Sequence, residues 1–482
     1  MASEGNIKEK DVFYEREPNR QNEKVSEAER QRVIRKIDIH LLPFISILYL
    51  LCFLDRTNVG NAKIAGLVKD AHLTGLKYNI IAAVFFIPYA LAEIPSNILL
   101  KIVRPSRWIP SIMIAWGTVM TLMCLCRTFK DLLVARIFLG LTESGFFPGV
   151  TFYLSLWYRR QDVALRIAIF FSAATLAGAF GGILAYGIEH MEGIGGLHGW
   201  QWIFCLEGLT TVVIAIFSYF FIHDYPQTAT FLTPHEQRLV TQMLEEDTQG
   251  LATHYDVKFV WQALGDYKYY LQALLYICIL VPVYAIALFM PTIINSLGYS
   301  AAKAQLLTIP PYVAGCIATI LVGYFSDKHN LRGLYIVGGC FVSLVGYIVL
   351  ITQTKPAVGY GGAIIATVGV FPVVAIDLAW VGSASGGDVR KGVAFAMVIG
   401  LGNLGGICSS FIYLKPPRFF VGHGTNIGLL SLAILVTLFI MWDFRRQNKA
   451  KEVYCAAHGL GEDQKSEFVE LGSESPLFRY TL

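Results

Sequence analysis

Ionisable side chains stand inside long apolar stretches of this sequence, where they are costly to bury. Asp55 and Arg56 are adjacent in Leu-Asp-Arg-Thr-Asn, and Arg136 and Glu143 lie seven residues apart in Arg-Ile-Phe-Leu-Gly-Leu-Thr-Glu. Seven residues make nearly two helical turns, so Arg136 and Glu143 share a helix face. A guanidinium stays charged and attracts anions, whereas a buried carboxyl group can take up and release a proton. The pattern predicts anion binding beside proton exchange.

Both pairs also have a purely structural interpretation. A helix that ends at Leu54 would leave Asp55 and Arg56 as a cap in water. Arg136 and Glu143 could form ion pairs with other helices that only hold the bundle together. The sequence leaves these alternatives open.

Four further residues are candidates on the same grounds. Asn58, Tyr89 and Asn403 are predicted to contact substrate, Tyr89 by stacking on a planar ring. Asn403 could instead make an interhelical hydrogen bond, and aromatic residues at such spacings more often face lipid or the core. Glu93, in Ala-Glu-Ile-Pro-Ser-Asn, is a third candidate for proton exchange, the alternative being a packing or gating residue.

Composition places these groups in a membrane. Hydrophobic residues make up 55% of the 482 residues and charged residues 15%, against about 25% charged in an average soluble protein. The net charge of +4 comes without basic runs interleaved with aromatics, which argues against nucleic-acid binding. The nine cysteines are an odd number and lie mostly in apolar stretches, so neither a disulfide framework nor a metal site is expected. The sequence shows no nucleophile–base pair or phosphate loop, so we expect no enzyme.

Twelve apolar stretches alternate with polar breaks. Most reach the ~20 residues that cross a bilayer, and they are too continuous for barrel strands. We therefore predict an all-α membrane protein with twelve transmembrane helices in two six-helix bundles. The predicted spans are 41–65, 80–103, 108–126, 132–153, 165–188, 202–222, 269–297, 306–325, 334–351, 359–381, 393–413 and 427–442.

The polar segments set the expected domains. These are a disordered tail at 1–36, a bundle at 37–222, a linker at 223–268, a second bundle at 269–444 and a tail at 445–482. Basic residues before the first span and after the last place both tails in the cytoplasm. We expect a monomeric multi-pass protein of the plasma membrane, with a vacuolar or other internal membrane as the alternative.

One polar loop suggests a conformational role. In Gly323-Tyr-Phe-Ser-Asp327-Lys328 a carboxylate ends a helix, with Lys328 after it and Arg332 opening the next helix. Opposite charges at neighbouring helix ends suit a latch on the cytoplasmic side. Ordinary basic-loop composition is the alternative.

The same loop resembles the loop signature of the major facilitator superfamily. Other segments resemble the fungal allantoate permease branch of the anion:cation symporter family, and the resemblance runs from about residue 36 to 445. These segments are residues 53–63, 93–97, 105–110, 143–149, 199–204 and 289–295. The sequence departs from this branch after Trp380, where Ser383 and Ala384 stand in place of a frequent Asn pair.

The resemblance implies a two-lobed carrier with a central site that works by alternating access. The branch includes carriers of nicotinate, pantothenate, biotin and allantoate, and a proton gradient rather than a cofactor drives its proton-coupled members. In such relatives, the groups that match Asp55, Arg56, Arg136 and Glu143 bind the anion and couple the proton.

The expected function is therefore proton-coupled uptake of a small organic anion, such as a vitamin or a nicotinate-like acid. Export of an acidic metabolite is the alternative. Exporters of the superfamily usually carry a Gly-Pro motif in helix five, whereas residues 176–182 have the glycines without a proline, which favours uptake. A non-transporting membrane sensor is the alternative from another class, and the short tails argue against it.

Overall fold

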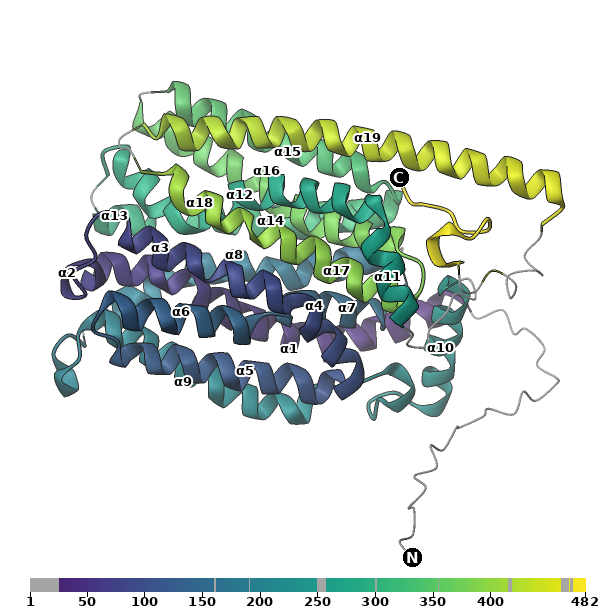
Figure 1. The fold of residues 1–482 in the computed structure, drawn as a ribbon, viewed down its shortest axis with the longest axis horizontal. Helices are drawn as coiled ribbons and strands as arrows, with labels where there is room; N and C mark the ends of the chain where they lie inside the picture. Colours follow the sequence, from purple (N-terminus) through teal and green to yellow (C-terminus); the bar gives the residue numbers. More distant parts are fainter. Residues whose placement is uncertain are drawn as a thin grey trace, which may run out of the picture.

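The computed structural model of the protein describes residues 26–482 apart from 160–161, 190, 249–256, 300, 354, 415–417, 461–467 and 469–470. Within this part of the chain, 12 helical segments are long and apolar enough to cross a membrane. They lie side by side in one bundle (Figure 1). The predicted all-helical fold with twelve spans is confirmed.

The first six spans form the N-terminal lobe, in which α1 packs on α8 and α9, and α5 packs on α9. Two of these spans are divided into shorter helices. The spans are α1 (Glu27–Ala62), α3 with α4 (Lys77–Val84, Phe86–Val103), α5 (Pro105–Leu122), α6 with α7 (Phe129–Glu143, Phe146–Ser155), α8 (Val163–Glu189) and α9 (Gly199–Phe221).

The last six spans form the C-terminal lobe, in which α15 packs on α16 and α19, and α12 packs on α17 and α19. The spans are α12 (Tyr267–Ser296), α14 (Ile309–His329), α15 (Arg332–Thr352), α16 (Pro356–Ala384), α17 with α18 (Asp388–Asn403, Gly405–Ile412) and α19 (Phe420–His458). The short connecting helices include α2 (Val68–Asp70), α10 (Pro234–Thr248), α11 (Val257–Gly265) and α13 (Ala301–Leu306).

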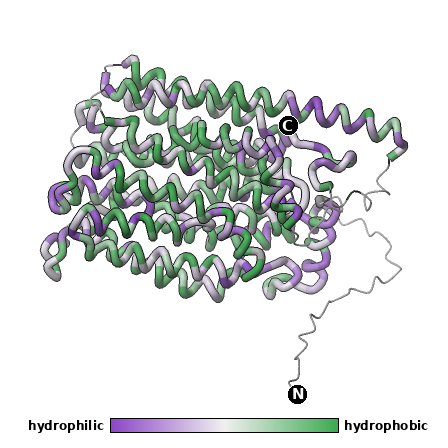
Figure 2. The backbone as a smooth tube through the Cα atoms, viewed as in Figure 1, coloured by the Kyte–Doolittle hydropathy of each residue, from purple (hydrophilic) through white to green (hydrophobic). Residues whose placement is uncertain are grey.

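The bundle has two ends, which we name by what they carry. The tail face carries α10, α11 and the C-terminus, and the far face carries α2 and α13 (Figure 1). Figure 2 shows hydrophobic residues along the spans and hydrophilic residues gathered toward the two ends, most densely at the tail face. This is the pattern of a bundle whose middle lies in hydrocarbon.

Helix α1 begins well before the first apolar stretch. Ser26 caps its first turn by accepting a hydrogen bond from the N–H three residues later at 3.1 Å. Val33 and Ile37, one turn apart, are buried on one face of the helix. The prediction of a disordered N-terminal tail is therefore wrong for residues 27–36, because capping and burial there stabilise a helix.

The polar linker also folds onto the first lobe. Lys36 of α1 forms an ion pair with Glu236 of α10 at 2.6 Å. This hydrogen bond from the ammonium group lowers the pKa of the Glu236 carboxyl. The linker therefore includes a helix held against the start of the first span.

The C-terminal segment returns to the tail face of its own lobe. Helix α19 continues past the predicted end of the last span to His458. Phe478 and Tyr480 are then buried, and the Arg332 N–H donates to the Leu482 carbonyl at 2.6 Å. The polar tail thus includes a short buried segment.

Glycines allow α15 and α16 to cross at close range. A Cβ on Gly369 would collide with the backbone of Ser343 and lie 2.6 Å from the Gly339 carbonyl oxygen. In contrast, a Cβ on Gly361 of the same helix would meet nothing within 4 Å. Small residues thus set this contact, as is common between membrane helices.

A charged cluster joins the two lobes at the tail face. Asp327 at the end of α14 accepts hydrogen bonds from the N–H groups of Ala164 and Leu165, at 3.2 and 2.6 Å, in the first turn of α8. Arg332 pairs with the same carboxylate at 2.7 Å. A carboxylate is favoured at a helix N-terminus, where free N–H groups and the helix dipole meet it. We call these four residues the tail-face latch.

The glycine crossing predicts a position-specific loss of stability. Gly369→Ala should lower the free energy of unfolding by about 1–3 kcal/mol, because the added methyl overpacks the crossing. The thermal unfolding midpoint of the purified protein in detergent measures this effect. Gly361→Ala is the matched control and should leave the midpoint unchanged or slightly raised. Equal effects of the two substitutions would contradict the role given to the crossing.

The latch predicts a shift between conformations. Asp327→Asn removes the charge that holds α8 and Arg332, so the tail-face ends of the lobes should separate in a larger fraction of molecules. Hydrogen bonds to charged groups contribute about 1.5–3 kcal/mol each, enough for a shift of at least tenfold. Distances between spin labels, one on each lobe at the tail face of a cysteine-depleted protein, measure the shift. Lys328→Gln, at an exposed neighbour, is the control and should leave the distances unchanged.

Candidate functional site

A chain of hydrogen bonds crosses the middle of the protein from one lobe to the other. Arg56 donates from Nε and Nη2 to one oxygen of Glu143, at 3.1 and 2.5 Å. Its Nη1 donates to the Tyr284 hydroxyl at 2.7 Å, and this hydroxyl donates to the Asn403 side-chain oxygen at 2.5 Å. We call these four residues the central chain. It connects α6 and α1 of the N-terminal lobe to α12 and α17 of the C-terminal lobe.

Breaks in two spans place the ends of the central chain. Glu143 is the last residue of α6, and the polypeptide backbone then passes through Gly145 at φ +82°. A side chain at Gly145 would collide with Ser96, so only glycine fits this turn. Asn403 is likewise the last residue of α17, before α18 begins at Gly405. Interrupted spans are a common means of presenting polar groups in the middle of a membrane protein.

The Arg56–Glu143 pair is enclosed. Arg56 is 5% exposed and Glu143 is fully buried. The guanidinium carbon lies 4.9 Å from the centre of the Tyr89 ring and 5.4 Å from that of Phe85, close enough for cation–π attraction. The Cys52 thiol donates to the same Glu143 oxygen at 3.2 Å. The expectation that Arg56 caps a helix end in water is excluded, because α1 continues to Ala62.

A small pocket lies against this pair between the lobes. Its empty volume is about 270 Å³, open solvent included. Arg56 and Asn403 provide its polar wall, and Tyr49, Phe147 and Tyr276 are among its aromatic lining residues. The rings of Tyr49 and Phe147 are stacked with centroids 5.0 Å apart. A cation beside flat aromatic walls suits a small anion that carries a ring.

Arg136 lies away from this pocket. Its Nε donates to the Ile81 carbonyl oxygen at 3.3 Å, and its guanidinium lies 4.9 Å from the Phe85 ring. Arg136 and Glu143 are both buried, but the carboxylate bonds Arg56 instead. Phe85 is thus a shared neighbour of two guanidinium groups, of which only Arg56 reaches the pocket.

A second buried polar cluster lies inside the N-terminal lobe. Asp55 accepts hydrogen bonds from the Trp116 indole at 3.2 Å and the Thr211 hydroxyl at 3.0 Å. Asn58 donates to Glu207 of α9. Asp55 and Glu207 are 1% and 5% exposed, and each has one carboxyl oxygen without a hydrogen-bond partner among the described residues. Asn58, predicted to contact substrate, is therefore engaged within its own lobe.

Glu93 is buried at the contact between the lobes. Both of its carboxyl oxygens lack a hydrogen-bond partner in the described part of the chain. A Cβ on Gly400 of α17 would lie 2.8 Å from one of them, so the carboxyl group is packed against the other lobe. Tyr89, one turn earlier on α4, faces Arg56 with its ring. The structure thus brings Tyr89 to the centre and Glu93 to its border.

Two buried acidic residues escaped the sequence analysis. Glu207 stands in the apolar stretch 202–222, and Asp377 stands in the stretch 359–381 with both oxygens unpartnered among the described residues. The rule that singled out Glu93, a charge inside an apolar stretch, would have found both.

The predicted gating residues lie together at the tail face. Asp327 and Arg332 belong to the latch, and Lys328 is exposed beside them. A Cβ on Gly323 would lie 2.5 Å from that of Ala168, so this glycine allows α14 to approach α8. Residues of both lobes therefore meet here, as a charge latch requires.

Comparison with known proteins is consistent with this architecture. Two solved structures share the fold at low sequence identity. The proton:xylose symporter XylE superposes with a TM-score of 0.67 at 15% identity, covering 86% of this chain and 96% of its own. The human organic anion transporter MFSD10 gives a TM-score of 0.63 at 12% identity, covering 83% of this chain and 99% of its own.

Other known proteins match this chain at higher sequence identity than these two solved structures do. An uncharacterized transporter of Schizosaccharomyces pombe is 35% identical over 90% of this chain and 87% of its own length. The high-affinity nicotinic acid transporter of Saccharomyces cerevisiae is 30% identical over 93% of this chain and 84% of its own. The model of the Major Facilitator Superfamily matches residues 45–410. With its twelve spans, two lobes and central charged pair, the chain belongs to the Major Facilitator Superfamily of transporters.

Proposed function

We propose that this transporter takes up a small organic carboxylate together with protons, by alternating access to the central pocket. The observation that carries the proposal is the buried pair of Arg56 and Glu143, which borders a pocket shared by the two lobes. An arginine beside a titratable acid can exchange one anionic partner for another.

The exchange follows from the cost of an unpaired buried charge. A guanidinium in a dry interior is costly to leave without an anionic partner, because its desolvation is then only partly compensated. Glu143 supplies this partner in the present conformation. When Glu143 takes up a proton, it loses its negative charge and its hold on Arg56, and a substrate carboxylate can replace it. Proton and anion therefore bind together, and the loaded centre stays neutral.

The C-terminal lobe senses this exchange through Tyr284. The Tyr284 hydroxyl accepts from Arg56 and donates to Asn403, so a shift of the guanidinium changes a bond that joins the lobes. Such a link allows substrate binding to favour one arrangement of the lobes over the other. Asn403 then has two roles, because it lines the pocket and its bond to Tyr284 changes when the substrate binds.

The other buried acids have supporting roles in this proposal. Asp55, Glu207 and Glu93 can each hold a proton during the cycle, because each has a carboxyl oxygen without a partner in the described structure. Arg136 adds positive potential near the centre without contacting the substrate, since it is directed at Ile81 and Phe85.

Two observations support an aromatic monocarboxylate as the substrate class. The pocket is small and its walls are largely aromatic, which suits one flat ring. One relative is a transporter of nicotinic acid, at 30% identity. The tail face carries the basic residues that flank the first and last spans, so we place it in the cytoplasm, with the far face outside.

Uptake into proteoliposomes tests the function. Labelled nicotinate should accumulate faster when the external medium is acidic than when it is neutral, because a proton must neutralise Glu143 before the anion binds. A proton uncoupler should abolish accumulation. Unlabelled pantothenate, biotin and allantoate should each reduce the uptake of labelled nicotinate to the extent that they fit the pocket. Glu143→Gln should still exchange nicotinate across the membrane but no longer accumulate it. Wild-type uptake that ignores both pH and the uncoupler would refute proton coupling, and net efflux under the same gradient would establish export.

The geometry of Arg56 predicts a strict requirement for arginine. Arg56→Lys keeps the charge but cannot bond Glu143 through two nitrogens and Tyr284 through a third. Uptake should fall by about tenfold or more, the effect of losing one or two charged hydrogen bonds. Initial uptake rates at matched protein amounts measure the loss. Arg127→Lys, at an exposed residue, is the control, and unchanged kinetics in Arg56→Lys would exclude Arg56 as the anion's partner.

A further inference from the structure

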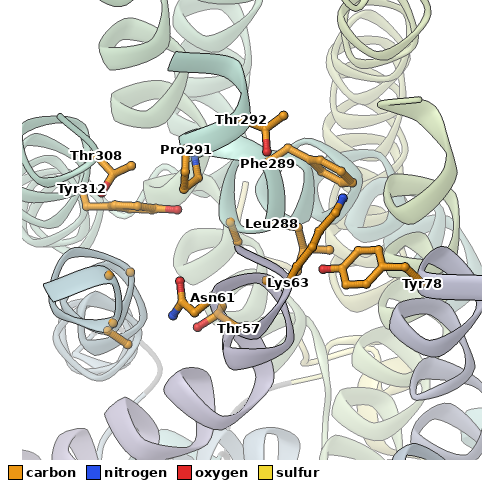
Figure 3. Close-up of a pocket in the computed structure, with 16 residues that line it drawn as sticks. Thr57, Asn61, Lys63, Tyr78, Leu288, Phe289, Pro291, Thr292, Thr308 and Tyr312 are labelled. Carbon is orange, nitrogen blue, oxygen red and sulfur yellow. The ribbon is translucent and has the colours of Figure 1, made fainter. Parts of the chain in front are cut away.

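A larger pocket lies between the lobes on the far-face side of the central chain. Its empty volume is about 690 Å³, open solvent included. Helices of both lobes line it, namely the end of α1 and the middle of α8 on one side, and α12 and the start of α14 on the other. Figure 3 shows polar side chains from α1 facing Thr292, Thr308 and Tyr312 across this space.

Lys63 provides the positive charge of this pocket. It begins the π-turn Lys63–Leu67 that follows α1, and its ammonium nitrogen lies 4.3 Å from the centre of the Tyr78 ring. Figure 3 shows the side chain extending beside Tyr78 toward Phe289. No carboxylate of the described residues forms an ion pair with it, in contrast to Arg56.

The walls around Lys63 leave room for a ligand. Gly181 and Gly182 of α8 face the pocket, and a Cβ on Gly182 would meet nothing within 4 Å. The Asn61 side chain lines the same wall (Figure 3). An ammonium group and an amide thus lie together beside the aromatic rings of Tyr78 and Phe289, which is a set that suits a small carboxylate with a flat ring.

The two pockets follow one another along the same helices. Lys63 lies seven residues after Arg56, which is nearly two turns or about 10 Å along a helix. On the opposite wall, Leu288 of the larger pocket lies one turn after Tyr284 of the central one. A Cβ on Gly60 would approach the Leu288 carbonyl oxygen at 3.8 Å, so the α1 and α12 backbones are near each other at the wall of the larger pocket.

We propose that Lys63 forms a separate capture site, in which the carboxylate of an incoming organic anion is held before it passes to Arg56. This rests on the proposed function as an anion carrier. The unpaired ammonium raises the local concentration of anions at the far-face pocket and is screened by salt. The anion then moves about two helical turns along α1, from one cation to the next.

Uptake kinetics separate this capture site from the central one. With nicotinate as the probe, Lys63→Gln should raise KM by about three- to fivefold, the effect of losing one solvent-accessible charge pair. The maximal rate should stay the same, because at saturating nicotinate the central site is filled whether or not Lys63 is present. Lys63→Arg should restore KM. Added salt should raise the KM of the wild type more than that of Lys63→Gln. Lys69→Gln, at an exposed lysine of the same face outside the pocket, is the control and should behave as wild type.

A binding measurement keeps the inference testable apart from transport. Arg56→Lys should retain weak, salt-sensitive nicotinate binding by equilibrium dialysis, and the double variant with Lys63→Gln should lose it. An unchanged KM in Lys63→Gln, with wild-type uptake intact, would overturn the capture site alone. No binding and no uptake of carboxylates by the wild type would instead overturn the proposed function and, with it, this inference.

Discussion

The structure depends on one constraint, that a guanidinium buried between two lobes is costly to leave without an anionic partner. Arg56 meets it with two bonds to a single oxygen of Glu143 and uses its remaining nitrogen to reach Tyr284. Nearby aromatic rings exclude water and strengthen the attraction without adding charge. In the proposed mechanism, the substrate carboxylate takes the place of Glu143 as this partner.

The fold meets this constraint by interrupting its spans where polar groups are needed. The break after Glu143 requires Gly145, whose left-handed backbone and contact with Ser96 leave no room for a side chain. In the second lobe α17 ends at Asn403, where Leu404 keeps right-handed backbone angles and no left-handed glycine is needed. A straight helix would satisfy its own backbone but would present these side chains less directly to the space between the lobes.

Sequence reasoning found the spans and most of the charged centre, because both follow from the cost of polar groups in hydrocarbon. Arg56 and Glu143 stood out on that basis alone. Their pairing did not follow from the sequence, since Arg136 shares a helix face with Glu143. Only the three-dimensional arrangement of the helices, which brings Arg56 within bonding distance of Glu143, decides between the two arginines.

Local sequence patterns also failed to predict the helical start of α1, the buried C-terminal segment and the partner of Asn58. The helical start of α1 depends on a cap and two buried residues in a segment that is polar overall, and the burial of Phe478 and Tyr480 depends on a chain reversal. Asn58 was assigned to the substrate, yet its partner Glu207 lies 149 residues further along the chain. Contacts between distant segments decide these cases, and one sequence does not display them.

The two lobes contribute unequal chemistry to the centre. Among the described residues of the central chain, both charged groups come from the N-terminal lobe, whereas the C-terminal lobe supplies a phenol and an amide. Under the proposed mechanism, replacements in the second lobe would therefore reshape the pocket wall and leave the ionic exchange in the first lobe untouched. Such a division offers an evolutionary route by which one inherited driving mechanism serves cargoes of different shape.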